Sequence, residues 1–326
     1  MKNRSTPGVA CALLIVAALT LSGAAGAQNY PARPVKLVVG FPPGGGVDIN
    51  ARLLASKLSE YMGQQVIVDN RPGAGTNIAN EYVARATPDG YTLLMNTAAV
   101  AINMSLYKKP GFDTLRDFAA VSVFSASPNI LVVNAATKAT NVAELIAEAR
   151  GSPGKLNYAS AGSGTTQHLS GELFKTLTRT DIVHIPYKGT APALAALISG
   201  EVQLSFANIP AIQSHVKSGR LRPLANTGLT RAQLMPDVPT LKEAGVDMNV
   251  VVWYGVLAPA ATPKEIVTKL GEMVRRAAHA PDLHQRLLDQ GAEPIGSSPE
   301  EFGRQLRAEV ASWAAVVKAS GASVND

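Results

Sequence analysis

Short apolar runs and helix-like repeats of apolar residues alternate along the first third of the chain. Residues 35–39 (VKLVV) form an apolar run of strand length, and residues 48–61 carry apolar side chains at helical spacing. The same criteria predict strands at 66–68 and 92–95 and a helix at 78–86. Because strand, turn and helix repeat in this order, the segment is predicted to form a parallel α/β half-domain with right-handed crossovers.

A second strand–helix series follows two β-rich runs, AVSVF and NILVV, which flank residues 125–128. The predicted helices of this series are 142–149, 166–177 and 192–198, and the predicted strands are 156–159, 182–186, 202–206 and 221–225. This order again favours an α/β lobe with its own sheet.

The last quarter of the chain has one more β-rich run, 250–257, and is predicted to be helical from 263 to 320, with breaks at Pro281 and 297–299. Three consecutive helices have no sheet of their own, so we expect them to pack on the first lobe. The chain would then leave lobe one near residue 126 and return near residue 250. Two such crossovers would form a hinge beside a cleft.

The N-terminal residues have the features of a secretory signal peptide. Lys2 and Arg4 precede an apolar run at 8–21, and small residues follow up to Ala27. The apolar run is shorter than the roughly 20 residues that span a bilayer, which disfavours a membrane anchor. We therefore expect residues 1–27 to be removed by cleavage after Ala27 and the remainder to lie in the periplasm.

Composition excludes several functional classes. Cys11 is the only cysteine and lies inside the apolar run, so no lipid anchor is expected, and the mature chain would have no disulfide or thiol nucleophile. Loss of Lys2 and Arg4 leaves 28 basic against 24 acidic residues, a net charge of +4 instead of +6. Basic residues are not clustered, so no nucleic-acid partner is predicted. The five histidines show no metal-binding spacing, and neither a metal nor a cofactor is predicted.

Four loops follow predicted strands and open predicted helices, where α/β sheets bind their ligands. They are 41–48 (FPPGGGVD), 70–77 (NRPGAGTN), 160–167 (SAGSGTTQ) and 185–190 (IPYKGT). In the first and third, glycines and helix N–H groups favour an anion over an ordinary turn. The second has Ile78 where a dinucleotide fingerprint needs glycine, so it is predicted to be a turn with a helix cap.

The fourth loop and the enzyme alternative stay open at this point. Tyr187 could line a pocket and Lys188 could attract an acid, or they could be a buried tyrosine beside a solvated lysine. The third loop is not a P-loop, because no G-K-[ST] ends it. It is not a nucleophile elbow either, because Ala161 and not glycine stands two residues before Ser163. An enzyme would need a base, and only Lys188 or Asp48 is available in the expected cleft. Asp48 is better explained as a helix-start residue.

The loops and their flanks, in this order, resemble the Bug/TctC family, the extracytoplasmic solute receptors of tripartite tricarboxylate transport systems. The segments that carry the resemblance are VVGFPPGGGVD, VIVDNRPGAGTNIA, PDGYTL, YASAGSGTTQHLSGELF, HIPYKGTAPALAALISGEVQ and VPTLKEAG. The resemblance implies an α/β, two-lobed periplasmic binding protein (type II, Venus flytrap) with two crossover strands as hinge. Lobe one would comprise 28–126 and 250–326, and lobe two 127–249.

The resemblance also implies a ligand, partners and a site. The ligand would be a small carboxylate, such as a di- or tricarboxylate, an aromatic acid or an acidic amino acid, and the receptor, a monomer, would pass it to membrane permease subunits. The first and third loops would grip the carboxylate and the fourth would form the far wall. The implied ligand-binding residues are Phe41, Gly44, Gly45, Thr97, Ala98, Ala161, Ser163, Gly164, Thr165, Thr166, Gln167, Tyr187, Lys188, Gly189 and Asn208.

Two alternatives compete with transport. The closed receptor could report to a sensor kinase of a two-component system instead of a permease, or the chain could be an exported enzyme on the same scaffold. No catalytic residue is predicted.

Overall fold

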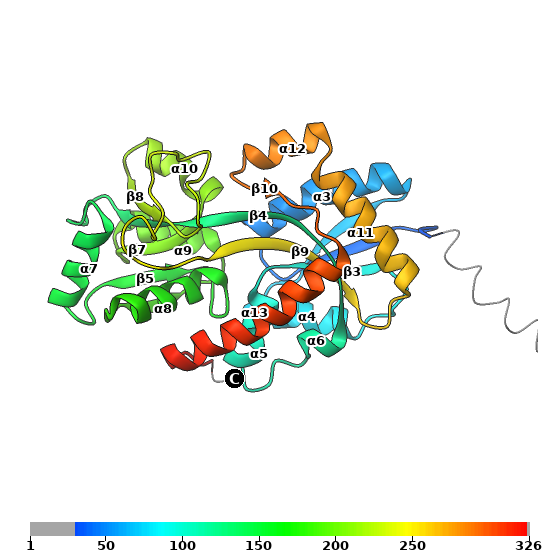
Figure 1. The fold of residues 1–326 in the computed structure, drawn as a ribbon, viewed down its shortest axis with the longest axis horizontal. Coiled ribbons are helices and arrows are strands. Elements are labelled where there is room, and N and C mark those ends of the chain that lie inside the picture. The colour runs from blue at the N-terminus through cyan, green and yellow to red at the C-terminus, as the bar shows by residue number, and fades with distance from the viewer. Residues whose placement is uncertain (1–29, 325–326) are drawn as a thin grey trace, which may run out of the picture.

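Two lobes lie side by side in the computed structural model, which describes residues 30–324; the expected signal peptide, 1–27, lies outside the described residues. Two long strands, β4 (Phe118–Asn134) and β9 (Val251–Pro259), run antiparallel across the junction (Figure 1). The expected α/β fold of two lobes with two crossover strands is confirmed.

Lobe one is built on three parallel strands with β1 in the middle. β1 pairs with β2 on one side and with β3 on the other, and β9 adds to β3 in the antiparallel sense. Each of these elements lies within two residues of its predicted bounds. The bounds are β1 Val35–Val39, α3 Gly46–Met62, β2 Val66–Asn70, α4 Asn77–Ala84 and β3 Thr92–Asn96.

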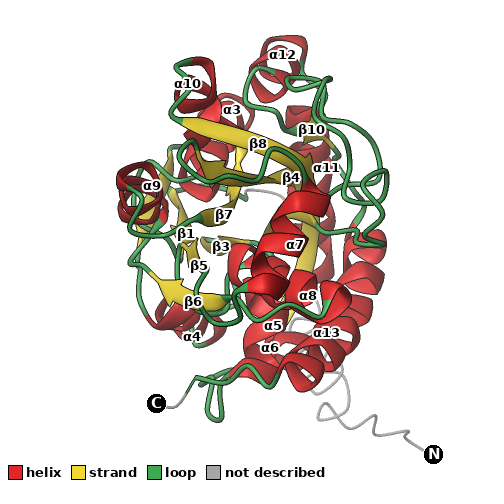
Figure 2. Cartoon of the chain, turned by 90° about the vertical axis from the view of Figure 1, so that its left-hand side faces the viewer, coloured by secondary structure: helices red, strands yellow, loops and turns green. Residues whose placement is uncertain are grey.

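Lobe two has a second parallel set, in which β5 lies between β6 and β7. β7 and β8 both pair antiparallel with β4, which ties this set to the crossover strand. Viewed end on, helices surround the strands of both lobes (Figure 2). The bounds are α7 Val142–Gly151, β5 Asn157–Ser160, α8 Thr166–Thr178, β6 Val183–Pro186, α9 Thr190–Ser199, β7 Leu204–Asn208, α10 Ile209–Lys217 and β8 Leu221–Asn226.

The two predicted β-rich runs, AVSVF and NILVV, both belong to β4. It is one strand that pairs with β9 as far as Pro128 and with β7 from Asn129 onward. Polar residues interrupt the apolar pattern at its centre, where Ser125 Oγ donates to the Asn50 side chain at 2.7 Å and both side chains are buried. A buried strand can carry a polar side chain such as Ser125 because a hydrogen-bond partner offsets the loss of water.

Three helices of the described residues were not predicted from the sequence: α5 (Ala99–Leu106), α6 (Thr114–Asp117) and α10. α5 has the sequence AVAINMSL and is buried on nearly every side, so it lacks the apolar–polar period of a surface helix. α6 is a single turn whose N-cap Asp113 accepts from the Leu115 and Arg116 N–H groups.

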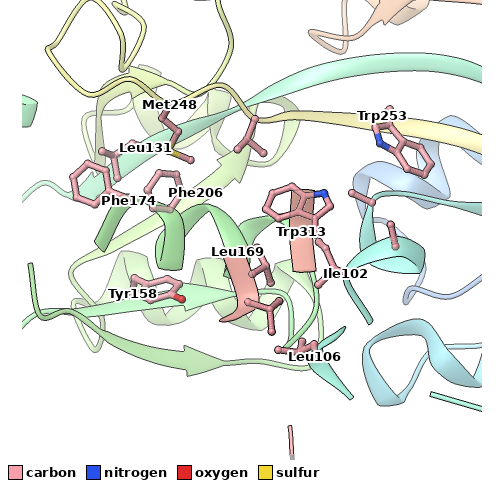
Figure 3. Packing of buried hydrophobic residues seen from close by; sticks show 14 of the residues in the cluster. Ile102, Leu106, Leu131, Tyr158, Leu169, Phe174, Phe206, Met248, Trp253 and Trp313 are labelled. Atoms are coloured by element: carbon pink, nitrogen blue, oxygen red, sulfur yellow. The ribbon is translucent and has the colours of Figure 1, made fainter. Parts of the chain in front are cut away.

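The C-terminal helices are α11 (Lys264–Ala278), α12 (Pro281–Leu288) and α13 (Pro299–Ser320), with the short strand β10 (Glu293–Pro294) before α13. α11 and α12 pack on lobe one, as expected, but α13 also reaches α8 in lobe two (Figure 1). Figure 3 shows Trp313 of α13 beside Ile102 of α5 and Leu169 of α8, all in one buried cluster. The terminal helix therefore joins the cores of both lobes.

No helix within residues 30–324 combines the length and the apolar character needed to span a bilayer.

Candidate functional site

A cavity of about 310 Å³ lies between the lobes, where the first, third and fourth loops meet. It is lined by eleven of the fifteen residues singled out from the sequence: Phe41, Gly44, Gly45, Thr97, Ala161, Thr165, Thr166, Gln167, Lys188, Gly189 and Asn208. The structure thus brings them together, while their contact with a ligand stays a prediction.

The other four residues lie outside the lining. Ala98 is buried in the core directly before α5, because the chain turns inward there to begin that helix. The Tyr187 hydroxyl donates to Glu201 at 2.8 Å, and its side chain packs against the core of lobe two. Ser163 and Gly164 lie at the back of the third loop and face lobe one, where a Cβ added at Gly164 would lie beside the Asn103 amide.

Four helices begin at the cavity: α3, α8, α9 and α10. The N-cap residues Gly45, Gly189 and Asn208 give their helices no side-chain cap, whereas Thr165 caps α8 by accepting from the His168 N–H. The first N–H groups of a helix have no partner inside it and carry partial positive charge. Three uncapped helix starts therefore offer hydrogen-bond donors for an anion.

Asp48 is fully engaged within the first loop. Its carboxylate accepts from the Gly44 N–H, from Arg52 Nε and from Asn70 Nδ2, each at 2.9 Å. Burial opposes ionisation, but these hydrogen bonds outweigh it and lower the pKa of Asp48. The residue holds the glycine turn in shape, which agrees with its interpretation as a helix-start residue.

Glycines let the loops of the two lobes touch. A Cβ on Gly46 would lie 2.5 Å from Asn208 Nδ2 and 2.8 Å from the Tyr254 hydroxyl. A Cβ on Gly189 would lie 3.2 Å from Pro42. Gly46 does not have a positive φ, so its backbone conformation does not require glycine. Glycine is needed at this position because any side chain would clash with Asn208 and Tyr254.

The second loop is a turn, as predicted, but its helix cap is absent. Thr76, the N-cap of α4, makes no capping hydrogen bond and has φ 87°. Its hydroxyl instead accepts from Asn80 and Asn96, each at 3.2 Å, and these buried amides hold the threonine in a conformation that β-branched residues avoid. A Cβ on Gly75 would meet the Ser163 carbonyl oxygen at 2.6 Å, so this turn supports the third loop from lobe one.

Two stacked histidines support the third loop from within lobe two. The His168 and His184 rings lie 4.0 Å apart, and the Gly164 N–H donates to His168 Nδ1 at 3.2 Å. Ser160 Oγ lies 2.7 Å from His184 Nε2. Burial lowers the pKa of His168 to about 4 and that of His184 to about 3, so both rings are neutral at pH 7.

Part of the lining comes from strands and was not predicted from the sequence. Asn129 of β4 and Val252 and Tyr254 of β9 line the cavity, but both runs were assigned to the hinge. Asn129, a polar residue at the start of the apolar run NILVV, was the available signal. The remaining lining residues not singled out are Pro42, Pro43, Gly46, Val47, Thr190, Ala191, Pro192, Leu194 and Ala211.

Comparison with known proteins extends over both lobes. A family model described as "Tripartite tricarboxylate transporter family receptor" matches residues 50–322. Protein BugT of Bordetella pertussis is 35% identical over 314 residues, which cover 95% of this chain and 96% of that protein. The structure "R. palustris Rpa4515 with adipate" is 42% identical, with a TM-score of 0.85, covering 90% of this chain and 98% of that chain. MatC from Rhodopseudomonas palustris, with bound malate, is 31% identical, with a TM-score of 0.83, covering 88% and 100%.

Proposed function

The chain belongs to the tripartite tricarboxylate transporter receptor family of solute-binding proteins, and we propose that its interlobe cavity binds a small carboxylate for delivery to membrane permease subunits. The observation that carries this proposal is the set of three helix starts without side-chain caps that open into one cavity. Their N–H groups suit a carboxylate, whose oxygens are strong acceptors.

The similar structures support the same ligand class. Rpa4515 was solved with adipate and MatC with malate, and both share the fold of this chain at more than 30% identity. A cavity of about 310 Å³ has room for an acid of that size. Backbone N–H groups recognise the carboxylate itself, so the rest of the ligand must be selected by other parts of the lining.

We also propose where the receptor works and how it holds its ligand. Cleavage after Ala27 would release a monomer into the periplasm, where residues 28–126 with 250–326 would close against 127–249 around the ligand. No observation on the described residues favours a sensor kinase over a permease as partner. The enzyme alternative loses one of its two candidate bases, since Asp48 is fully hydrogen-bonded.

Isothermal titration of the purified protein against a panel of small mono-, di- and tricarboxylates tests the proposal. We expect at least one acid to bind, and Thr166→Val to weaken that binding about tenfold, because the variant removes a hydroxyl from the cavity wall. Thr176→Val is the matched control, since Thr176 is exposed on the same helix. Absence of heat with every acid of the panel would refute a carboxylate receptor.

A further inference from the structure

Two asparagines from neighbouring strands share the wall of the cavity. Asn129 of β4 and Asn208 of β7 are direct partners in the antiparallel register, so their side chains project from the same face of the sheet, about 5 Å apart at Cβ. Both line the cavity, and they are only 1% and 7% exposed. We call them the asparagine pair.

Each member of the pair has one unsatisfied polar atom. Among residues 30–324, neither Asn129 Nδ2 nor Asn208 Oδ1 has a hydrogen-bond partner. The Asn208 amide is oriented by the Tyr254 hydroxyl, which hydrogen-bonds its side chain and lies near Nδ2, so Oδ1 is the atom that remains free. The backbone of Asn129 is fixed as well, because its N–H donates to Thr227 Oγ1 at 3.0 Å and its carbonyl accepts from the Thr227 N–H at 2.9 Å.

A buried donor without a partner and a buried acceptor without a partner are each unfavourable, and one ligand group that contacts both asparagine side chains would satisfy them together. That group must accept from Asn129 Nδ2 and donate to Asn208 Oδ1. A hydroxyl and a primary carboxamide do both, whereas a carboxylate only accepts and an ammonium only donates. The pair therefore matches an uncharged polar group.

The charges around the cavity point the same way. Lys188 is the only lining residue with a charged side chain, and it is exposed to solvent. A second carboxylate placed against the asparagine pair would face the side-chain oxygen of Asn208, Oδ1. No buried cation of the lining would neutralise the charge of that carboxylate. A carboxylate at the helix starts instead faces N–H donors, whose partial positive charge favours an anion.

We propose that the asparagine pair determines specificity and that the receptor selects a small monocarboxylate that also carries a hydroxyl or a primary carboxamide. The inference rests on the proposed function, since it assigns the rest of a ligand whose carboxylate is held by the helix starts. The asparagine pair lies on the crossover strand β4 and on β7, outside the first and third loops that would hold the carboxylate.

Calorimetry with length-matched acids tests the selection directly. The four-carbon set is butyrate, succinate, succinic acid monoamide and 4-hydroxybutyrate, and the six-carbon set is hexanoate, adipate, adipic acid monoamide and 6-hydroxyhexanoate. In at least one set, the monoamide or the hydroxy acid should bind about tenfold or more tightly than both the diacid and the plain acid. The ratio between the monoamide and the hydroxy acid then identifies which neutral group is preferred.

The outcomes separate the two proposals. If acids bind but the diacid or the plain acid equals the neutral-polar acids in both sets, the asparagine pair does not select and the carboxylate receptor stands. If no acid of either set, nor of the wider panel, binds, both proposals fall. These comparisons use the unaltered protein, so they do not depend on whether a variant folds.

Asn129→Asp tests the residue itself, because it replaces the free Nδ2 donor with an acceptor oxygen. The preference for the neutral-polar acid over the plain acid should fall about tenfold. Asn249→Asp makes the same change at an exposed site of lobe two and should keep the preference. An unchanged preference in a folded Asn129→Asp protein, with folding checked by thermal melting, would overturn the role of Asn129.

Discussion

At the residue scale, the stacked histidines link the stability of lobe two to pH. Besides each other, the charged or titratable side chains that face His168 and His184 are Tyr158, Glu172 and Lys175. A neutral His168 accepts from the Gly164 N–H, and protonation at Nδ1 would remove that acceptor. The third loop therefore depends on an imidazole that stays unprotonated.

The sign of the pH effect follows from the lowered pKa of His168. Above pH 6.5 the ring is neutral in both the folded and the unfolded chain, but between pH 6.5 and about 4 only the unfolded chain takes up the proton. The free energy of unfolding should thus fall over that range, by roughly 2 kcal/mol from this residue at pH 4.5.

Thermal unfolding of His168→Asn at pH 7 and at pH 4.5 measures this contribution. The asparagine oxygen can still accept from Gly164, so the variant should lose less stability on acidification than the unaltered protein. His279→Asn, which changes an exposed histidine, should follow the unaltered protein. Equal acid sensitivity of all three proteins would contradict the assignment.

At the element scale, α13 fastens the hinge strand β9 to the shared core. Glu309 of α13 accepts from Trp253 Nε1 of β9 at 2.9 Å and from Trp313 Nε1 of its own helix at 2.5 Å. Both tryptophans are buried. One carboxylate therefore satisfies two buried indole donors and ties the terminal helix to a crossover strand.

Glu309→Ala should lower the free energy of unfolding by roughly 2 kcal/mol, because it leaves two buried N–H groups without an acceptor. Urea unfolding followed by tryptophan emission measures the change, and Trp253 and Trp313 are the only tryptophans in the chain. Glu300→Ala changes an exposed glutamate at the start of the same helix and should cost less than about 0.5 kcal/mol. Equal effects of the two variants would mean that the indole contacts contribute nothing.

At the scale of the whole molecule, ligand affinity should depend on how closely the lobes approach. Gly46 of lobe one lies against Asn208 of lobe two and Tyr254 of β9, at distances that leave no room for a methyl group. Gly46→Ala should keep the loops apart, so that the helix starts and the asparagine pair no longer enclose one ligand.

Small-angle scattering with and without the tightest-binding acid tests this dependence. The unaltered protein should become more compact with ligand, while Gly46→Ala should compact less and bind about tenfold more weakly. Gly151→Ala is the control, since a Cβ at Gly151 meets nothing within 4 Å. Normal affinity and normal compaction in Gly46→Ala would rule out the close approach of the lobes as a requirement for binding.

The sequence by itself determined the elements whose hydrophobic period is local. Strands such as β1 and helices such as α3 lie within two residues of their predicted bounds, because a buried strand and an amphipathic helix each leave a pattern in consecutive residues. The glycine-rich loops could also be found, since glycine and a following helix start are adjacent in the chain. Most of the predicted site residues consequently line the cavity.

Only the tertiary structure decided which distant residues share that cavity. α5 is buried on nearly every side and so shows no surface period, and β4 carries buried serines whose partners lie far along the sequence. Asn129 and Asn208 are 79 positions apart, and the β4–β7 register alone places them side by side with one donor and one acceptor unsatisfied. Local patterns record burial and backbone conformation, whereas pairing across a sheet depends on long-range contacts that no run of neighbouring residues encodes.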